Sequence, residues 1–134
     1  MTPFPLKIVT PDGLIFDGQA EELIVRTATG DQGILARHTN MVAPLGMGRA
    51  TIIIDGERRY AACIGGMVSV VDGAVTLVPT TFEWAEDIDL KRAEHAAENA
   101  KAIIDSKDAS AADSQMAQAR LKRALIRSNV AKPM

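Results

Sequence analysis

The sequence contains little of what most active sites are built from. Its 134 residues include one cysteine and two histidines, and aromatic residues make up 4%. No HExxH pattern, CxxC pair or GxxxxGK[ST] loop occurs, which argues against the common zinc, redox and P-loop classes. A single cysteine, Cys63, cannot form an intramolecular disulfide and fits a reducing compartment. An enzyme is therefore a poor hypothesis, and we expect Cys63 to be a small core residue.

Long apolar runs and a strong net charge are also missing. The net charge is −2, which gives no reason to expect nucleic acid as a partner. No run approaches 18 apolar residues, and no basic-then-apolar leader opens the sequence. We therefore expect a soluble, cytoplasmic protein that reaches a membrane only through a partner. With 47% apolar and 24% charged residues, the chain should fold as one domain, or a small domain with an appendage.

Residues 1–85 have the composition and punctuation of a sheet. Three pairs, Asp12-Gly13, Asp55-Gly56 and Asp72-Gly73, supply the positive φ angles of tight hairpins, so each predicts a strand reversal. Gly65-Gly66 predicts a backbone bend or bulge rather than a phosphate-binding loop. Closely spaced short strands are typical of an antiparallel sandwich or barrel. The predicted strands are 7–10, 22–26, 51–54, 60–63, 67–71 and 74–78.

From Ile88 onward the sequence follows a helical period. A polar break at 105–108 separates two apolar patterns with three- and four-residue steps, and Pro133 lies beyond the second. Two helices joined by a short loop make an antiparallel αα-hairpin, which we expect over 86–134. The predicted faces are Ala93, Ala96, Ala97, Ala100, Ile103 and Ile104 on the first helix, and Ala117, Leu121, Ala124, Leu125 and Ser128 on the second.

Polar residues mark where both predicted helices begin. We expect Asp87 to be the N-cap of the first helix, with Asp89 in its first turn at the positive end of the helix dipole. Ser110 and Asp113 resemble a capping box at the start of the second helix, with the shorter acid in place of glutamate.

The two predicted helices carry opposite charge. Residues 86–108 hold seven acids and four bases, a net charge of −3, and residues 110–134 hold five bases and one acid, a net charge of +4. The helices should therefore attract each other. Their seam is mostly alanine, which buries little apolar area at roughly 25 cal/mol per Å². We expect a conditionally stable hairpin that can open or detach from the sandwich.

Several short motifs, in their order along the chain, resemble the epsilon subunit of the bacterial F-type ATP synthase. The frame Gly30-x-x-Gly33-Ile34 precedes His38 and a later Pro-Leu pair. The resemblance also rests on residues 6–13 with Phe16, on 65–70 and 74–77, on Glu86-Asp87-Ile88-Asp89 with Arg92-Ala93, and on 121–124 with Arg127. Together they cover essentially the whole chain. The resemblance implies an N-terminal antiparallel β-sandwich over 1–85 that docks on other subunits, followed by a regulatory two-helix hairpin over 86–134.

The sequence departs from the family's pattern in the loop around His38. Ala36-Arg37 stands where the family commonly has Pro-Gly, and Thr39-Asn40 stands where Ala-Pro or similar is usual. Ile64 replaces the serine that usually precedes the paired glycines. These differences concern the details of the loops and leave the family assignment in place.

The resemblance implies a non-catalytic subunit of the rotor's central stalk, which couples proton translocation to ATP synthesis without a required cofactor. Its implied partners are the gamma subunit, the c-ring and the alpha and beta subunits. The complex would place it at the cytoplasmic face of the cell membrane as a peripheral component. The residues implied to face the c-ring or gamma are Gly30, Asp31, Gln32 and His38. From the residues alone, Asp31 is also an ordinary polar turn residue, and His38 also a loop histidine bound by backbone.

The resemblance further implies a nucleotide site on the folded hairpin, with the motif Ile/Leu-Asp-x-x-Arg-Ala. The residues implied are Glu83, Ile88, Asp89, Arg92, Ala93, Arg123 and Arg127. Asp89 would accept a hydrogen bond from adenine, and the arginines would bind phosphates. ATP bound to both helices would stabilise the closed hairpin, as a regulatory ligand. The alternative is that Asp89 and Arg92 are only a helix-start pair. Asn99 stands where some nucleotide-binding relatives carry a basic residue.

A second implication is inhibition of ATP hydrolysis. An extended hairpin would insert a basic face beside the catalytic subunits, and that face consists of Arg120, Lys122, Arg123 and Arg127. A solvated basic surface is the alternative interpretation of the same residues. A second hypothesis, from a different class of protein, is a free-standing nucleotide-sensing β-sandwich module that is not part of a motor. A small enzyme is the third hypothesis, and the missing nucleophile–base set argues against it.

Overall fold

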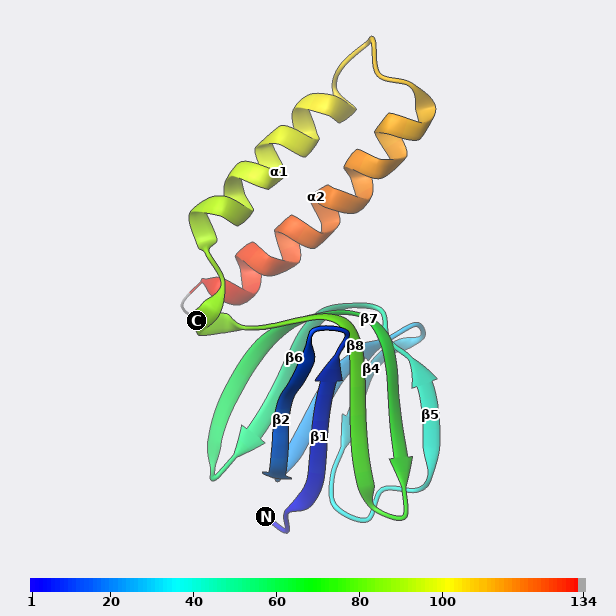
Figure 1. Cartoon of the computed structure of the whole chain (residues 1–134), viewed down its shortest axis with the longest axis vertical. Helices are drawn as coiled ribbons and strands as arrows, with labels where there is room; N and C mark the ends of the chain where they lie inside the picture. Colours follow the sequence, from blue (N-terminus) through cyan, green and yellow to red (C-terminus); the bar gives the residue numbers. More distant parts are fainter. Residues whose placement is uncertain (133–134) are drawn as a thin grey trace. The chain divides into compact units, whose positions relative to one another are not determined.

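A computed structural model of the chain describes residues 1–132 and divides it into two compact units, Met1–Trp84 and the segment from Ala85 onward. The first unit is built of strands and the second of helices (Figure 1). The expected fold class, an N-terminal antiparallel β-sandwich followed by a two-helix hairpin, is confirmed. Pro133, which was expected beyond the second helix, lies outside the described residues. None of the described helices has the length and apolar character needed to span a membrane.

The strands of the first unit pair in the order β2-β1-β8-β7-β6-β3-β4, and β5 pairs with β7 beside that path. All neighbours are antiparallel except β1 and β8, which are parallel. The strands are β1 (Phe4–Thr10), β2 (Gly13–Ala20), β3 (Glu22–Thr27), β4 (Gly30–Ile34), β5 (Met41–Pro44), β6 (Met47–Ile54), β7 (Glu57–Val71) and β8 (Ala74–Trp84).

The core lies between the inward-facing residues of the folded sheet. In β1, the buried Phe4, Leu6 and Ile8 alternate with the exposed Pro5 and Lys7, which is the period of a strand with one face in the core. Buried residues from the other long strands join them in one cluster, including Leu23, Val25, Ile34, Ala50, Ile52, Val68, Val70, Val75, Leu77 and Phe82. The first unit therefore has a hydrophobic core of its own.

All three Asp-Gly pairs reverse the chain, as predicted. In the β6–β7 turn, Asp55 and Gly56 have φ angles of 52° and 78°, and in the β7–β8 turn Asp72 and Gly73 have 51° and 82°. Two successive positive φ angles are what a two-residue hairpin turn requires.

The predicted strands 60–63 and 67–71 are a single strand, β7, that bends at Gly65 and Gly66. These two glycines have φ angles of 67° and 98°. One half of β7 pairs with β6, where Met47 faces Ile64, and the other half pairs with β5, where Pro44 faces Met67. The prediction of two separate strands was wrong because the bend continues the ladder without ending it.

Three strands were missing from the prediction, namely β2, β4 and β5. Their sequences are GLIFDGQA, GDQGI and MVAP, and each contains glycine, aspartate or proline, which lower the intrinsic preference for strands. Pairing with a neighbouring strand overrides that preference here, because each of the three is held by a register of at least four residue pairs.

The second unit consists of a short 3₁₀ turn, η1 (Ala85–Asp87), and two antiparallel helices, α1 (Leu90–Ile104) and α2 (Ala111–Ala131). The expected alanine seam is confirmed by the burial of Ala93, Ala97, Ala100, Ala117 and Ala124. Ala96, Ile103, Ile104 and Leu121 are half-buried at its margins. Ser128 is also buried, and its Oγ donates to the carbonyl of Ala124 at 2.9 Å. Placing Leu125 on the seam was wrong, since its side chain is 41% exposed.

The first helix begins later than expected, so the assignment of Asp87 as its N-cap was wrong. The chain turns once as η1, and Asp89 is the N-cap, with an extended backbone and a carboxylate that accepts from the Arg92 backbone N–H at 3.1 Å. The side chain nearest the exposed amides of the first turn is the one that caps them. For α2 the N-cap half of the predicted capping box is confirmed, because Ser110 Oγ accepts from the Asp113 N–H at 3.1 Å.

Candidate functional sites

Asp31 lies in strand β4, so its interpretation as an ordinary turn residue was wrong. The β3–β4 register places it opposite Arg26, and Arg26 Nε lies 2.9 Å from Asp31 Oδ1. A Cβ at position 48 would lie only 2.8 Å from Arg26 Cβ. Glycine at this position therefore leaves room for the aliphatic part of the Arg26 side chain. The exposed fractions of the two side chains are 52% and 61%. An ion pair this exposed adds little stability, and its main effect is to fix the direction of the Asp31 carboxylate.

Gln32 and His38 contact each other across the β4–β5 loop. His38 Nδ1 lies 2.8 Å from the carbonyl oxygen of Thr39, and His38 Nε2 lies 3.4 Å from Gln32 Nε2. A carbonyl only accepts, so Nδ1 carries the proton and Nε2 is left to accept from the Gln32 amide. At the start of β4, the Gly30 carbonyl accepts from Thr27 Oγ1 at 2.7 Å. Gly30, Asp31, Gln32 and His38 thus lie on one strand and its following loop, and we call them the β4–β5 cluster.

The start of α1 holds four of the residues assigned to a nucleotide. Ile88 and Ala93 are buried and anchor the helix start within the second unit, whereas the side chains of Asp89 and Arg92 are exposed. Asp89 is engaged by the Arg92 backbone N–H, which leaves the Arg92 guanidinium outside the cap. Glu83, also assigned to this site, belongs to β8 of the first unit.

The end of α2 holds the arginines assigned to phosphate binding. Arg123 and Arg127 are four residues apart, share a helix face and are half-buried. The hairpin is antiparallel, so this end of α2 lies beside the start of α1 (Figure 1). The structure therefore brings Ile88–Ala93 and the two arginines to the same end of the hairpin. Arg120 and Lys122, the other members of the basic face, are exposed.

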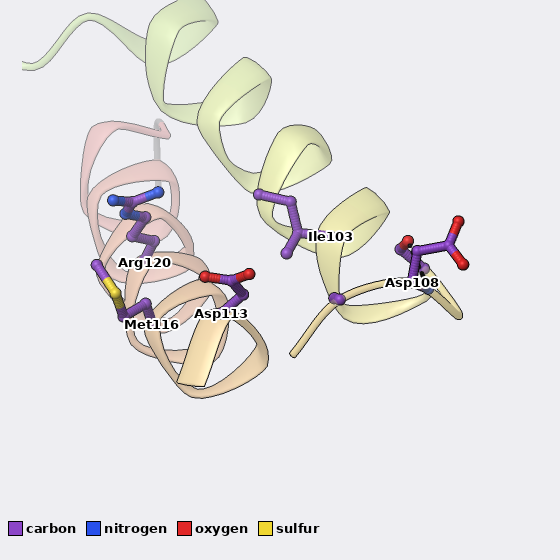
Figure 2. A pocket seen from close by; sticks show the side chains of 7 residues that line it. Ile103, Asp108, Asp113, Met116 and Arg120 are labelled. Atoms are coloured by element: carbon purple, nitrogen blue, oxygen red, sulfur yellow. Dashed lines mark hydrogen bonds between the residues drawn. The ribbon is translucent and has the colours of Figure 1, made fainter. Parts of the chain in front are cut away.

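A cavity of about 340 Å³ lies at the opposite, loop end of the hairpin. It is lined by Ile103, Ser106, Asp108, Ala109, Asp113, Met116 and Arg120. Figure 2 shows Asp113, Met116 and Arg120 on α2 and Ile103 on α1, while the carboxylate of Asp108 points away from Arg120. None of the residues assigned to the nucleotide lines this cavity, although Arg120 of the basic face does.

The remaining residues considered for chemistry have structural roles. Cys63 is buried, and desolvation raises the pKa of its thiol to about 12, so it is not a nucleophile at neutral pH. Trp84 is half-buried against Phe82, whose ring centroid lies 5.0 Å away, and the Arg59 guanidinium stacks over its indole at 3.7 Å. Among the described residues, no group of three or more His, Cys, Asp or Glu side chains is placed to hold a metal ion.

Two arginines near the β4–β5 cluster were missed in the sequence. The role of Arg26 as the partner of Asp31 follows from the β3–β4 register, which sets the two residues opposite each other. Arg37 has a φ angle of 66°, a backbone conformation that sequence patterns do not report for an arginine. The one available signal for Arg37 was that it follows Ala36 where a Pro-Gly pair, typical of a type II turn, is common.

These features define a class of protein with a β-sandwich unit followed by an antiparallel αα-hairpin. Residues 3–85 match the family model described as the beta-sandwich domain of the ATP synthase delta/epsilon chain, and residues 86–132 match its long alpha-helix domain. The chain is 36% identical over 132 residues to the ATP synthase epsilon chain of Shouchella clausii, covering 98% of this chain and 97% of that one. It is 44% identical over 98 residues to that of Alkaliphilus oremlandii, covering 73% of each chain.

Solved structures give the same result. A chain in the cryo-EM structure of the Euglena gracilis mitochondrial ATP synthase, described as OSCP/F1/c-ring, matches with a TM-score of 0.80 and 25% identity, covering 91% of this chain and 77% of that one. A chain of the Tetrahymena thermophila central stalk/c-ring structure shares the fold, with a TM-score of 0.61 and 15% identity over 96% of each chain. The protein belongs to the delta/epsilon chain family of the ATP synthase and is an epsilon subunit.

Proposed function

We propose that this epsilon subunit is a non-catalytic part of the central stalk, which couples proton translocation to ATP synthesis. Its partners are the gamma subunit, the c-ring and the alpha and beta subunits. The observation that carries the proposal is that both units, in order, match the two domains of the delta/epsilon chain. Solved neighbours described as F1/c-ring and central stalk/c-ring support the choice of partners. The subunit would then lie peripherally at the cytoplasmic face of the cell membrane.

An exposed apolar stripe on the outer face of the sandwich is suited to docking on gamma. The register sets Met67 of β7 opposite Pro44 of β5 and Val78 of β8, and the residues adjacent to them in sequence, Val68 and Leu77, point into the core. Met67 is 49% and Val78 45% exposed. Val42 and Val71, on the same strands, are 64% and 56% exposed. Adjacent exposed apolar side chains of this size mark an interaction surface.

The double variant Met67→Thr/Val78→Thr is expected to weaken binding to gamma at least about 10-fold, because two apolar side chains leave the interface. Threonine keeps the strand preference, so the thermal midpoint of the isolated chain should change little. Calorimetry with purified gamma measures the affinity. Leu125→Gln, which removes an exposed apolar side chain from α2, is the matched control. Equal affinities for the wild type and the double variant would contradict docking through this stripe.

The β4–β5 cluster is the proposed contact with the c-ring. It presents a carboxylate whose direction is fixed by Arg26 and an imidazole whose tautomer is fixed by Thr39 and Gln32. Side chains held in one conformation lose less entropy on binding, which favours a polar docking surface of this kind.

The hairpin is the proposed regulatory element. ATP would bind at the end where Ile88, Asp89, Arg92 and Ala93 lie beside Arg123 and Arg127. Glu83, which the resemblance also implies for this site, lies in β8 of the first unit. In the absence of ATP, the open hairpin would bring Arg120, Lys122, Arg123 and Arg127 to the catalytic subunits and stop hydrolysis. The alanine seam supports such a switch, since small buried side chains contribute little free energy to closure.

Arg92→Ala is expected to weaken binding of Mg-ATP to the isolated chain about 10-fold or more, and Arg123→Ala by a similar factor, through loss of charge-assisted hydrogen bonds. Arg92→Ala leaves the helix cap in place, because Asp89 accepts from the backbone of residue 92 and not from its guanidinium. Calorimetry is the primary measurement, since Trp84 packs against Phe82 and Arg59 and its emission can be insensitive to the hairpin. Lys91→Ala, which changes an exposed lysine at a variable position of the motif, is the control.

No heat of binding with the wild-type chain would remove the ATP part of the proposal and leave Asp89 as a helix cap. Equal affinities for wild type, Arg92→Ala and Arg123→Ala would place ATP elsewhere on the chain. The alternative function, a free-standing nucleotide-sensing module, predicts that ATP binds but that the chain does not co-purify with gamma and the catalytic subunits.

A further inference from the structure

Arg37, in the turn at residues 36–37 between β4 and β5, has a left-handed backbone conformation in which glycine is the usual residue. Among the described residues, Arg37, Asp55 and Asp72 are the non-glycine residues with a positive φ. The two aspartates each precede a glycine in a hairpin turn, where this conformation is expected. Arg37 also lies in a turn, but no glycine follows it, and arginine is not among the residue types enriched in left-handed backbone. Glycine would adopt this φ of 66° without the Cβ clash that arginine suffers.

The side chain of Arg37 gains nothing within its own chain that would offset the strain. It is exposed, and no hydrogen bond or ion pair of its guanidinium is found with any residue that the structure describes. A non-glycine residue held in such a conformation is a reason to look for a function outside the isolated fold.

The surroundings of Arg37 form a cavity of about 430 Å³ at one end of the sandwich. Arg37, His38 and Asn40 line it together with Asp72 of the β7–β8 turn and with residues 2–5. Asn40 Oδ1 accepts from the Asp72 backbone N–H at 2.8 Å, which ties the loop to the neighbouring turn. The guanidinium is therefore carried by a braced loop, three residues beyond the end of the β4 strand that bears Asp31 and directly before His38.

We propose that Arg37 is a docking residue whose guanidinium binds a carboxylate that a c-ring subunit presents to the β4–β5 loop. This inference rests on the proposed contact between the β4–β5 cluster and the c-ring. The planar guanidinium matches a carboxylate with two parallel N–H donors. An anionic lipid headgroup offers similar chemistry, but surfaces that bind such lipids gather several bases, whereas here a single arginine shares the cavity with the acid Asp72.

Three substitutions separate the charge of Arg37 from its backbone strain. Arg37→Gly removes both, Arg37→Ala removes the charge and keeps the Cβ strain, and Arg37→Lys keeps charge and strain. The thermal midpoint of the isolated chain should rise by about 2–4 °C in Arg37→Gly and stay near wild type in Arg37→Ala. Affinity for ATP synthase membranes stripped of epsilon should fall about 10-fold or more in both, and less in Arg37→Lys. A stabilised variant that docks less well is not what a purely structural residue would give.

Two further variants make the outcomes distinguishable. Asp31→Ala tests the proposed cluster itself, and Arg58→Ala, which removes an exposed arginine from β7, is the control for charge. If Asp31→Ala weakens attachment while Arg37→Ala and Arg37→Gly attach like wild type, the Arg37 inference is wrong and the cluster remains. If Asp31→Ala also attaches like wild type, the proposed c-ring contact fails. A thermal midpoint of Arg37→Gly below that of the wild type would show that the backbone of Arg37 is not strained. The isolated wild-type chain is also tested for binding to vesicles of anionic lipid. If it binds and Arg37→Ala abolishes the binding, the ligand of Arg37 is a lipid headgroup and not a carboxylate of the c-ring.

Discussion

Gly66→Ala is expected to abolish the folded sandwich, or to lower its free energy of unfolding by at least about 4 kcal/mol. A Cβ at this position would overlap the carbonyl oxygen of Val78 and lie 2.7 Å from Pro79 Cα, and both neighbours are backbone atoms of the paired strand β8. The φ of 98° is also one that alanine avoids. Neither strand can retreat, since the bend of β7 is also held from its other side: the N–H of Leu45, the residue after β5, donates to the Gly66 carbonyl at 2.8 Å.

Two matched glycines separate the steric effect from the conformational effect. Gly73 has a φ of 82° but nothing within 4 Å of an added Cβ, so Gly73→Ala should cost roughly 1 kcal/mol from backbone strain alone. Gly33 also has open space around it, so Gly33→Ala should be nearly neutral. Urea unfolding followed by circular dichroism measures all three. A Gly66→Ala protein no less stable than Gly73→Ala would show that the bend in β7 is not constrained by β8.

Deleting residues 87–134 is expected to raise the ATP hydrolysis rate of the reconstituted synthase at low ATP. The expected increase is about 5-fold or more, which corresponds to the lower end of typical allosteric coupling free energies. The basic face proposed to inhibit hydrolysis is lost with the hairpin, while Met1–Trp84 keeps its own core. The truncated subunit should therefore still unfold cooperatively and still bind gamma. The measurement is a comparison of initial hydrolysis rates, with ATP synthesis assayed in the same vesicles.

A charge-only variant tests whether the basic residues themselves inhibit. Arg120→Gln/Lys122→Gln removes two exposed bases from α2 and keeps the helix, and Lys91→Gln/Lys101→Gln does the same on α1 as the control. We expect the double substitution in α2 to give part of the increase in hydrolysis rate that the deletion gives. The double substitution in α1 should leave the rate unchanged. Unchanged hydrolysis after the full deletion would remove inhibition from the proposal, without affecting the docking role of the sandwich.

Local signals in the sequence were enough for the two-part fold. Each Asp-Gly pair specified a reversal, because aspartate and glycine tolerate the positive φ angles that a tight hairpin needs. The alanine period and Ser110 specified the hairpin, since both depend on residues within one or two turns of each other. Asp87 was chosen over Asp89 as the cap of α1 because both acids suit a helix start. The side chain that meets the Arg92 N–H is decided only by where the chain leaves the 3₁₀ turn.

What only the tertiary structure decided are the relations between residues distant in sequence. Strand register made Arg26 the partner of Asp31 and joined the predicted strands 60–63 and 67–71 through one bend. The packing of the loop around residues 36–40 placed Arg37 in left-handed backbone beside Asp72. The sequence by itself determined the elements and the family, because turns, caps and periodicity act through neighbouring residues. The tertiary structure decided the cross-strand pairs, the continuity of β7 through its predicted bend and the place of Arg37 beside Asp72, because these depend on contacts between residues that are distant in sequence.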